Sequence, residues 1–159
     1  MSGRQRRAGP RPRRVRESPA ALLLLDTHIW YWMAERMLER VTAKLPDTIA
    51  TASDEGRTYV SAFSAWELGL LVAKGRIRLA VDLAEWIAKT RGARGVRLVD
   101  VTAEIAVAST RLPGSFHGDP ADRIIIATAR SMGATLVTRD RRILDYGREG
   151  HLRVLDASP

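Results

Sequence analysis

Cysteine is absent from this chain of 159 residues, which excludes disulfides, a thiolate nucleophile and a zinc site with Cys ligands. Long hydrophobic runs are also missing. The longest, Ala20–Leu25, is far shorter than the roughly 20 residues that a membrane-spanning helix needs. Asp26 ends this run, so the arginine-rich start has no apolar segment long enough for a signal peptide. These absences predict a cytoplasmic protein with no membrane segment.

The sequence also lacks the common nucleotide-binding motifs. Neither G-x-G-x-x-G nor G-x-x-x-x-G-K-[ST] occurs, which disfavours a bound nucleotide cofactor. The histidines His28, His117 and His151 are scattered, so no nucleophilic triad is indicated, and we interpret each as a surface or hydrogen-bonding residue. The tryptophans lie on helical patterns and are interpreted as core or interface residues rather than base-stacking platforms: Trp30, Trp32, Trp66 and Trp86.

Positive charge is concentrated at the start of the chain. Residues 1–20 hold seven arginines and one glutamate, so +6 of the net +8 lies there, and only +2 remains for residues 21–159. Residues 1–19 contain too few apolar side chains to offset the entropy of ordering them, and we predict a disordered basic arm. A nucleic-acid-binding arm and a solubilising or over-extended start both fit this composition. One domain is expected over residues 20–159.

Apolar runs of strand length alternate with amphipathic helical patterns along this domain. Such alternation predicts an α/β fold with a mainly parallel sheet. Strands are predicted at 21–25, 58–63, 96–99, 134–137 and 152–155. Helices are predicted at 29–37, 39–55 with an interruption near Pro46, 64–71, 81–89, 102–110, 119–132 and 140–146.

Four acidic residues recur where strands end or helices begin. Asp26 ends the first strand, and Asp140 follows the strand that ends in LVT. Glu67 and Asp122 lie near the starts of two helices. Ligands of an open parallel sheet bind at the carboxyl ends of its strands, beside helix N-termini, so all four could face one crevice.

Helix capping is the competing interpretation for each acid alone. Ser64 and Glu67 have the spacing of a capping box, with the hydroxyl on one amide and the carboxylate reaching back. Asp119 and Asp122 repeat this spacing around a proline. The other two acids could each cap the helix that follows. Only the joint placement of four carboxylates favours a chemical role.

Carboxylates held close together repel one another unless a cation neutralises them. Oxygen ligands without Cys or clustered His suit Mg²⁺ or Mn²⁺. Such an ion can orient a phosphodiester and activate a water, which is nuclease or phosphatase chemistry.

The blocks LLLDTHIWYW, SAFSAWELGLLVAKGRI, HGDPADRIIIATAR and LVTRD together resemble the PIN domain, and more narrowly the VapC toxins of type II toxin–antitoxin pairs. The resemblance spans residues 22–156 with the blocks in family order. It implies a three-layer α/β/α PIN-like fold and an Mg²⁺- or Mn²⁺-dependent endoribonuclease that acts on RNA. It also implies a homodimer and a cognate antitoxin whose tail occupies the active-site groove. The arginine arm departs from the family, whose members commonly start near the first strand.

By position, the resemblance implies that four acids are catalytic and bind the metal: Asp26, Glu67, Asp122 and Asp140. Asp140 resembles the least constant of them, which often acts through water. Three further residues would be accessory: Asp119, for which we favour capping, Thr138 and Arg123. Basic residues near the groove would contact RNA phosphates, for example Arg123, Arg139 or Arg142.

Two alternatives remain open at this point. One is a PIN-domain nuclease of RNA processing that is not a toxin. The other is an inactive PIN-like module that only binds a protein or RNA. The presence of all four acids argues against the inactive module, because a degenerate site has no reason to keep carboxylates that repel one another.

Overall fold

The computed structural model describes residues 20–92 and 95–159, so the arm expected over residues 1–19 lies outside the described residues. Five strands form one sheet in the order β3-β2-β1-β4-β5, and all four strand pairings are parallel. The strands are β1 (Leu23–Leu25), β2 (Thr58–Ser61), β3 (Arg97–Val99), β4 (Thr135–Thr138) and β5 (Val154–Asp156). The predicted α/β fold with a mainly parallel sheet is confirmed.

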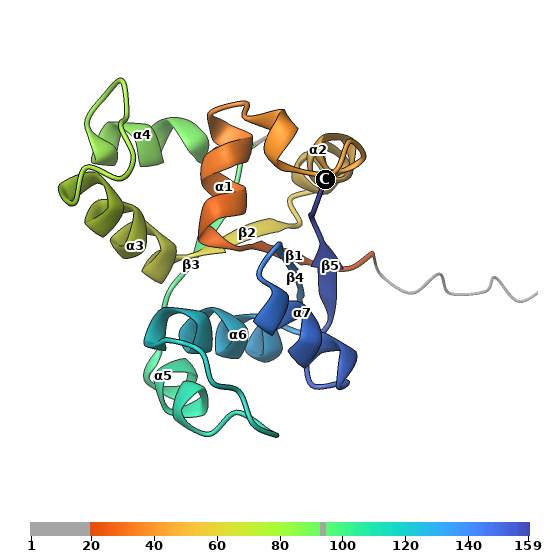
Figure 1. Cartoon of the computed structure of the whole chain (residues 1–159). Helices are drawn as coiled ribbons and strands as arrows, with labels where there is room; N and C mark the ends of the chain where they lie inside the picture. The colour runs from red at the N-terminus through yellow and green to blue at the C-terminus, as the bar shows by residue number, and fades with distance from the viewer. Residues whose placement is uncertain (1–19, 93–94) are drawn as a thin grey trace, which may run out of the picture.

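Helices cover both faces of this sheet. Figure 1 shows α1, α2, α3 and α4 on one side of the strands and α5, α6 and α7 on the other. Their bounds are α1 (Thr27–Ala34), α2 (Leu45–Asp54), α3 (Ala62–Ala73), α4 (Leu83–Thr90), α5 (Ala103–Thr110), α6 (Pro120–Met132) and α7 (Arg141–Arg148), with a 3-10 turn η1 at Leu38–Arg40. The three-layer α/β/α arrangement is therefore present. The helices in the described part of the chain are too short or too polar to cross a bilayer.

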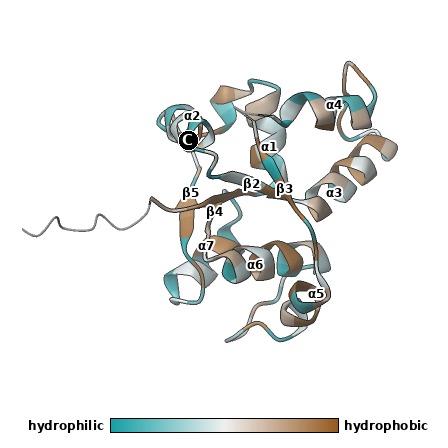
Figure 2. Ribbon diagram, turned by 180° about the vertical axis from the view of Figure 1, so that it is seen from behind, coloured by the Kyte–Doolittle hydropathy of each residue, from teal (hydrophilic) through white to brown (hydrophobic). Residues whose placement is uncertain are grey.

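The central strand β1 is buried on both faces, which explains its uninterrupted run of leucines. Leu23 and Leu25 pack into the cluster shared with α1–α4, whereas Leu24 packs with Ile125 and Ile143 on the other side. Successive side chains of a strand point to opposite faces, so one short leucine run contributes to two cores. Figure 2 shows brown segments in the sheet, between helices that carry both brown and teal residues.

Most expected elements are present with bounds shifted by a few residues, and the first helix, expected at 29–37, is Thr27–Ala34. Two further differences have a clear local cause. Pro46 does not interrupt a helix from 39 to 55. It lies in the first turn of α2, where a missing amide proton costs nothing, and only the turn η1 precedes it. The helix expected from Ser64 begins earlier, at Ala62, because Ser61 at the end of β2 is its N-cap and accepts a hydrogen bond from the Phe63 amide at 3.1 Å.

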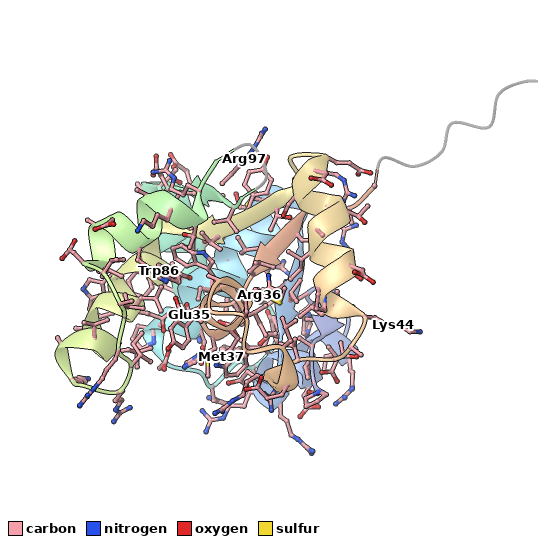
Figure 3. All side chains as sticks on the ribbon, turned by 90° about the horizontal axis from the view of Figure 1, so that it is seen from above. Glu35, Arg36, Met37, Lys44, Trp86 and Arg97 are labelled. Atoms are coloured by element: carbon pink, nitrogen blue, oxygen red, sulfur yellow. The ribbon has the colours of Figure 1, made fainter. Side chains whose placement is uncertain are left out.

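The corner after α1 contains a strained residue. Glu35 accepts a hydrogen bond from Trp86 Nε1 at 2.6 Å, which ties the end of α1 to α4. Figure 3 shows these two side chains beside Arg36 and Met37. Arg36 has a φ of 56°, a left-handed conformation that glycine adopts more readily than other residues.

We expect Arg36→Gly to raise the free energy of unfolding by about 0.5–1 kcal/mol, because it removes this backbone strain. Gly75 is the matched control. Its φ is 65° with open space around it, so Gly75→Ala should cost about 1 kcal/mol from backbone strain alone. Urea unfolding of the two variants measures both values. A destabilised Arg36→Gly would show that the Arg36 side chain itself contributes to stability.

Candidate active site

Five carboxylates line one cleft of about 740 Å³. The cleft lies where β1 and β4 end, beside the N-termini of α1, α6 and α7. We refer to these five side chains as the cleft carboxylates: Asp26, Glu67, Asp119, Asp122 and Asp140. The structure thus brings together all four acids predicted from the sequence, as well as the accessory Asp119.

Asp26 is held by both of its carboxylate oxygens. Oδ1 accepts from the Thr27 amide at 2.7 Å, which makes Asp26 the N-cap of α1, and Oδ2 accepts from the Thr138 hydroxyl at 2.6 Å. Burial raises the pKa of Asp26, against the opposing effect of these two hydrogen bonds. Capping and membership of the cleft are therefore not alternatives for this residue.

Asp140 is coupled to Asp26 through the same threonine. The buried Thr138 hydroxyl accepts from the Asp140 amide at 3.0 Å while it donates to Asp26. Asp140 Oδ1 in turn accepts from the Arg142 amide at 2.8 Å, as the N-cap of α7. Thr138 thus contacts two of the residues that carry cleft carboxylates and links the ends of β1 and β4.

Glu67 is positioned by a pair of buried hydroxyls. Thr27 Oγ1 lies 2.5 Å from Glu67 Oε2 and 2.8 Å from Ser64 Oγ. An ionised carboxylate only accepts, so Thr27 donates its single proton to Glu67 and Ser64 then donates to Thr27. Burial is the main cause that raises the pKa of Glu67 to about 7. The predicted capping box is wrong: Ser64 faces Thr27, and Glu67 is the sixth residue of α3.

Asp119 and Asp122 form the cap predicted for α6. Asp119 Oδ1 accepts from the Asp122 amide at 3.0 Å, and Pro120 occupies the first helical position. The Asp122 carboxylate faces the cleft. Burial and then the negative charges of the other cleft carboxylates raise the pKa of Asp122 to about 7.

The arginines named from the sequence have different positions. Arg123 does not line the cleft; its Nε donates to the Ser109 carbonyl at 2.8 Å and its Nη1 to the Phe116 carbonyl at 2.7 Å. It therefore fixes the segment before α6, and this placement does not fit the predicted phosphate contact. Arg139 and Arg142 do line the cleft.

Sequence reasoning missed the hydroxyls of Thr27 and Ser64 and the cleft position of Trp32. Thr27 directly follows Asp26, and a hydroxyl next to a strand-end acid is the signal that could have indicated it. For Trp32, helical periodicity alone did not separate the core face of α1 from the cleft face. Trp30 and Trp86 are core residues as predicted, with 1% and 5% exposure, whereas Trp66 is 55% exposed.

We expect Thr27→Val to raise the pKa of Glu67 above its wild-type value of about 7 in metal-free protein, because the Thr27 hydrogen bond favours the charged form. The control is Thr48→Val, which removes an exposed hydroxyl that only contacts the Lys44 carbonyl. NMR titration of the Glu67 side-chain carboxyl resonance measures the shift. An unchanged pKa in Thr27→Val would show that the Thr27 hydroxyl does not favour the charged form of Glu67.

The cleft fits a divalent cation by the type and charge of its donors. Carboxylate oxygens suit Mg²⁺ and Mn²⁺. Within residues 20–92 and 95–159, none of the cleft carboxylates forms an ion pair. No three His, Asp or Glu side chains of these residues already converge on one point as a finished metal site. An ion would therefore have to draw the carboxylates together against the repulsion that helps to raise the pKa values of Glu67 and Asp122.

Comparison with known proteins gives a consistent result. Residues 23–149 match the family model of the PIN domain. Ribonuclease VapC22 of Mycobacterium tuberculosis (strain ATCC 25618 / H37Rv) is 39% identical over 124 residues, which cover 78% of this chain and 91% of that protein.

Solved structures share the fold at low sequence identity. The crystal structure of VapBC2 from Rickettsia felis bound to a promoter DNA fragment contains a chain with a TM-score of 0.62 and 16% identity, covering 86% of this chain and 99% of that one. A chain in the structure of FitAB bound to the IR36 DNA fragment has a TM-score of 0.60 and 19% identity, covering 85% and 94%. The matched family model and the 39% identical relative show that this chain belongs to the PIN-domain family, in its VapC group.

Proposed function

We propose that the protein is a metal-dependent endoribonuclease and the toxin of a type II toxin–antitoxin pair. The observation that carries this proposal is a cleft with five carboxylates, none of which forms an ion pair among the described residues. The name of the 39% identical relative, a ribonuclease, supports RNA as the substrate. A nuclease of RNA processing would share this cleft and differ in its partner.

Asp26, Glu67 and Asp122 would hold an Mg²⁺ or Mn²⁺ ion, with Asp140 acting through a water. Such an ion would supply an activated water and stabilise charge on the phosphodiester. Neighbouring residues of the chain orient the carboxylates and favour their ionised form through hydrogen bonds. Thr138 and the Thr27 amide fix the two oxygens of Asp26, and the Thr27 hydroxyl fixes Glu67. Because the pKa values of Glu67 and Asp122 are about 7, the charged, ion-binding form is favoured above that pH.

The test is incubation of the purified protein with a panel of structured and single-stranded RNAs. Parallel samples contain Mg²⁺, Mn²⁺ or EDTA. We expect cleavage at internal positions with either ion and none with EDTA. Cleavage that persists in EDTA would contradict the metal requirement, and an uncut panel with intact RNA binding would favour a binding module.

The partner we propose is an antitoxin protein. The similar chains in solved structures come from VapBC and FitAB complexes, which supports this kind of partner. A cleft with five carboxylates, none of them ion-paired within residues 20–92 and 95–159, suits a basic segment, most simply an arginine that contacts a carboxylate through two hydrogen bonds. A homodimer, as the family resemblance implies, is part of the same proposal.

We expect the inhibitory segment of the antitoxin to present Arg or Lys to Asp26, Glu67 and Asp122. Reversing the charge of that residue should restore RNase activity in the purified complex, because a carboxylate there would be repelled by the cleft. Reversal of a basic antitoxin residue outside the cleft is the control. Inhibition that survives the cleft-facing reversal would contradict the charge-based contact.

A further inference from the structure

The three arginines that line the cleft are not equivalent. Arg141 and Arg142 are exposed, and in the described part of the chain their side chains make no hydrogen bond or ion pair. Arg139 is partly buried, and its guanidinium is fixed from two directions. Nη1 donates to the Arg40 carbonyl at 2.6 Å, and Cζ lies 5.0 Å from the centre of the Trp32 ring. Only Arg139 therefore has a fixed orientation at the cleft.

The ring beneath Arg139 is itself firmly placed. Trp32 lies on α1, packs against the core cluster of the α1–α4 side, and lines the cleft. Its other aromatic neighbour is His28, with the ring centres 5.5 Å apart. A guanidinium stacked on a tryptophan is attracted by the electrons of the ring and keeps its N–H groups in a fixed plane. Trp32 thus provides a rigid support for Arg139.

The charge of Arg139 remains available to a ligand. Of its five N–H donors, only one on Nη1 is used by the Arg40 carbonyl. Among the described residues Arg139 forms no ion pair, although Asp156 is close enough for Arg139 to help lower its pKa. A fixed guanidinium with free donors matches a phosphate group, which it can contact through two hydrogen bonds.

The cleft carboxylates favour the presence of a fixed positive group beside them if the substrate is a polyanion. Five carboxylates in one cleft repel a phosphodiester backbone. A bound divalent cation would offset only part of their negative charge, so part of the repulsion would remain. A positive group at the rim of the cleft compensates for it, and a fixed one also sets the register of the strand, because phosphate contacts position a nucleic acid.

We propose that Trp32 and Arg139 form a built phosphate-binding subsite that positions the RNA backbone at a linkage next to the one that is cleaved. This inference rests on the proposed ribonuclease function and deepens it. Arg139 is the group that touches the phosphate. Trp32 is a positioning residue, which acts by holding the guanidinium in plane. The subsite recognises the backbone and not a base.

The first experiment measures binding of a short fluorescein-labelled single-stranded RNA by anisotropy in Mg²⁺. The Asp122→Asn protein serves as the background, in which cleavage is prevented. We expect Arg139→Lys to weaken binding about tenfold, although the charge is kept, because an ammonium can neither stack on Trp32 nor form the double contact. The matched control is Arg141→Lys at an exposed, unsupported position, for which we expect a change below about twofold.

Trp32 is tested with two variants because its ring also packs against the core. Trp32→Phe keeps an aromatic support and should weaken binding only slightly, whereas Trp32→Leu should approach the loss seen for Arg139→Lys. Thermal unfolding of both variants separates this effect from loss of the fold. If Trp32→Leu is folded and its loss of RNA affinity adds to that of Arg139→Lys in the double variant, the two residues do not act as one subsite.

The second experiment locates the contacted phosphate. A series of RNAs carries one uncharged methylphosphonate, moved along the strand. The Asp122→Asn protein should bind about tenfold more weakly when the methylphosphonate occupies one linkage next to the cleavage position. The same protein with Arg139→Lys should bind this RNA no more weakly than the unmodified RNA. Equal sensitivity in both proteins at every linkage would overturn the subsite.

These outcomes separate the inference from the function on which it rests. If the wild type cuts RNA with Mg²⁺ but Arg139→Lys binds and cuts normally, the subsite is wrong and the ribonuclease stands. If the wild type neither binds nor cuts any RNA of the panel, the proposed function fails first. If RNA affinity depends on the identity of one base and not on the position of the methylphosphonate, Trp32 and Arg139 recognise a base instead of the backbone.

Discussion

Asp122→Asn should leave the metal-free protein as stable as the wild type, or stabilise it by about 1–2 kcal/mol, while RNA cleavage falls by several orders of magnitude. The charges of the other cleft carboxylates contribute to the pKa of about 7 at Asp122, so an uncharged side chain of nearly the same shape removes repulsion. The gain in stability is smaller than the full pKa shift of Asp122 would give, because burial is the larger cause of that shift and Asn remains a buried polar group. In the same variant, the stabilisation of the folded state by Mg²⁺ should shrink.

The matched control is Asp47→Asn. Asp47 is the third residue of α2, as Asp122 is of α6, and both helices carry a proline in their first turn. Asp47 is exposed and lies outside the cleft, so its replacement should cost only the few tenths to about 1 kcal/mol of a helix-terminus charge and leave cleavage unchanged. Melting curves with Mg²⁺ and with EDTA, beside an RNase assay, measure all of these effects. An Asp122→Asn protein that is destabilised in EDTA, responds normally to Mg²⁺ and still cuts RNA would return Asp122 to a capping role.

The metal-free protein should become less stable as the pH rises from about 5 to about 7, and then level off. Glu67 and Asp122 have folded-state pKa values of about 7, raised from ordinary values of 4.5 and 3.8. Between those limits the folded protein holds protons that the unfolded chain has already released, so the free energy of unfolding falls with increasing pH. The pKa of Asp26 is raised as well and acts in the same direction.

Excess Mg²⁺ should reduce this loss, because ion binding to the ionised carboxylates stabilises the folded state most where they are charged. Asp156 and Glu104 have lowered pKa values and act in the opposite direction, but their effect is complete near pH 5. Urea unfolding in EDTA and in Mg²⁺, at intervals from pH 5 to pH 8.5, measures both curves. The Glu67→Gln, Asp122→Asn double variant should lose less stability than the wild type over this range in EDTA, and Asp26 should account for the loss that remains. A wild-type stability that rises over this range without metal would show that the carboxylates are not held in a repelling cluster.

The sequence was informative wherever local patterns decide structure. The run of leucines before Asp26 predicted a strand buried on both faces, and the HGDPADR segment predicted the α6 cap correctly. The rule that ligand sites lie at the carboxyl ends of parallel strands predicted that four separate acids share one cleft, and all four line it.

The errors arose where distant contacts decide between two local possibilities. Ser61 and Ser64 are both capable caps, and only the approach of Thr27 from α1 explains why Ser64 faces inward and Ser61 begins the helix. Arg123 sits in the most specific motif, yet the carbonyls of Ser109 at the end of α5 and of Phe116 in the following loop hold it away from the cleft. Trp32 shares a helix with the core residue Trp30, but it lines the cleft and contacts Arg139, a residue more than 100 positions away in the sequence.

The hydrogen bond between Asp26 and Thr138 joins residues 112 positions apart, and this spacing has a consequence for synthesis of the chain. Asp26 is made early, but β4, the Thr138 hydroxyl and Asp140 are among the later segments. A nascent chain that ends before these residues has only part of the cleft and lacks one neighbour of its central strand. The cleft is therefore incomplete on the ribosome until Thr138 and Asp140 have been added to the chain. The ribonuclease proposed above would therefore be inactive until the segment of β4 and Asp140 has been added.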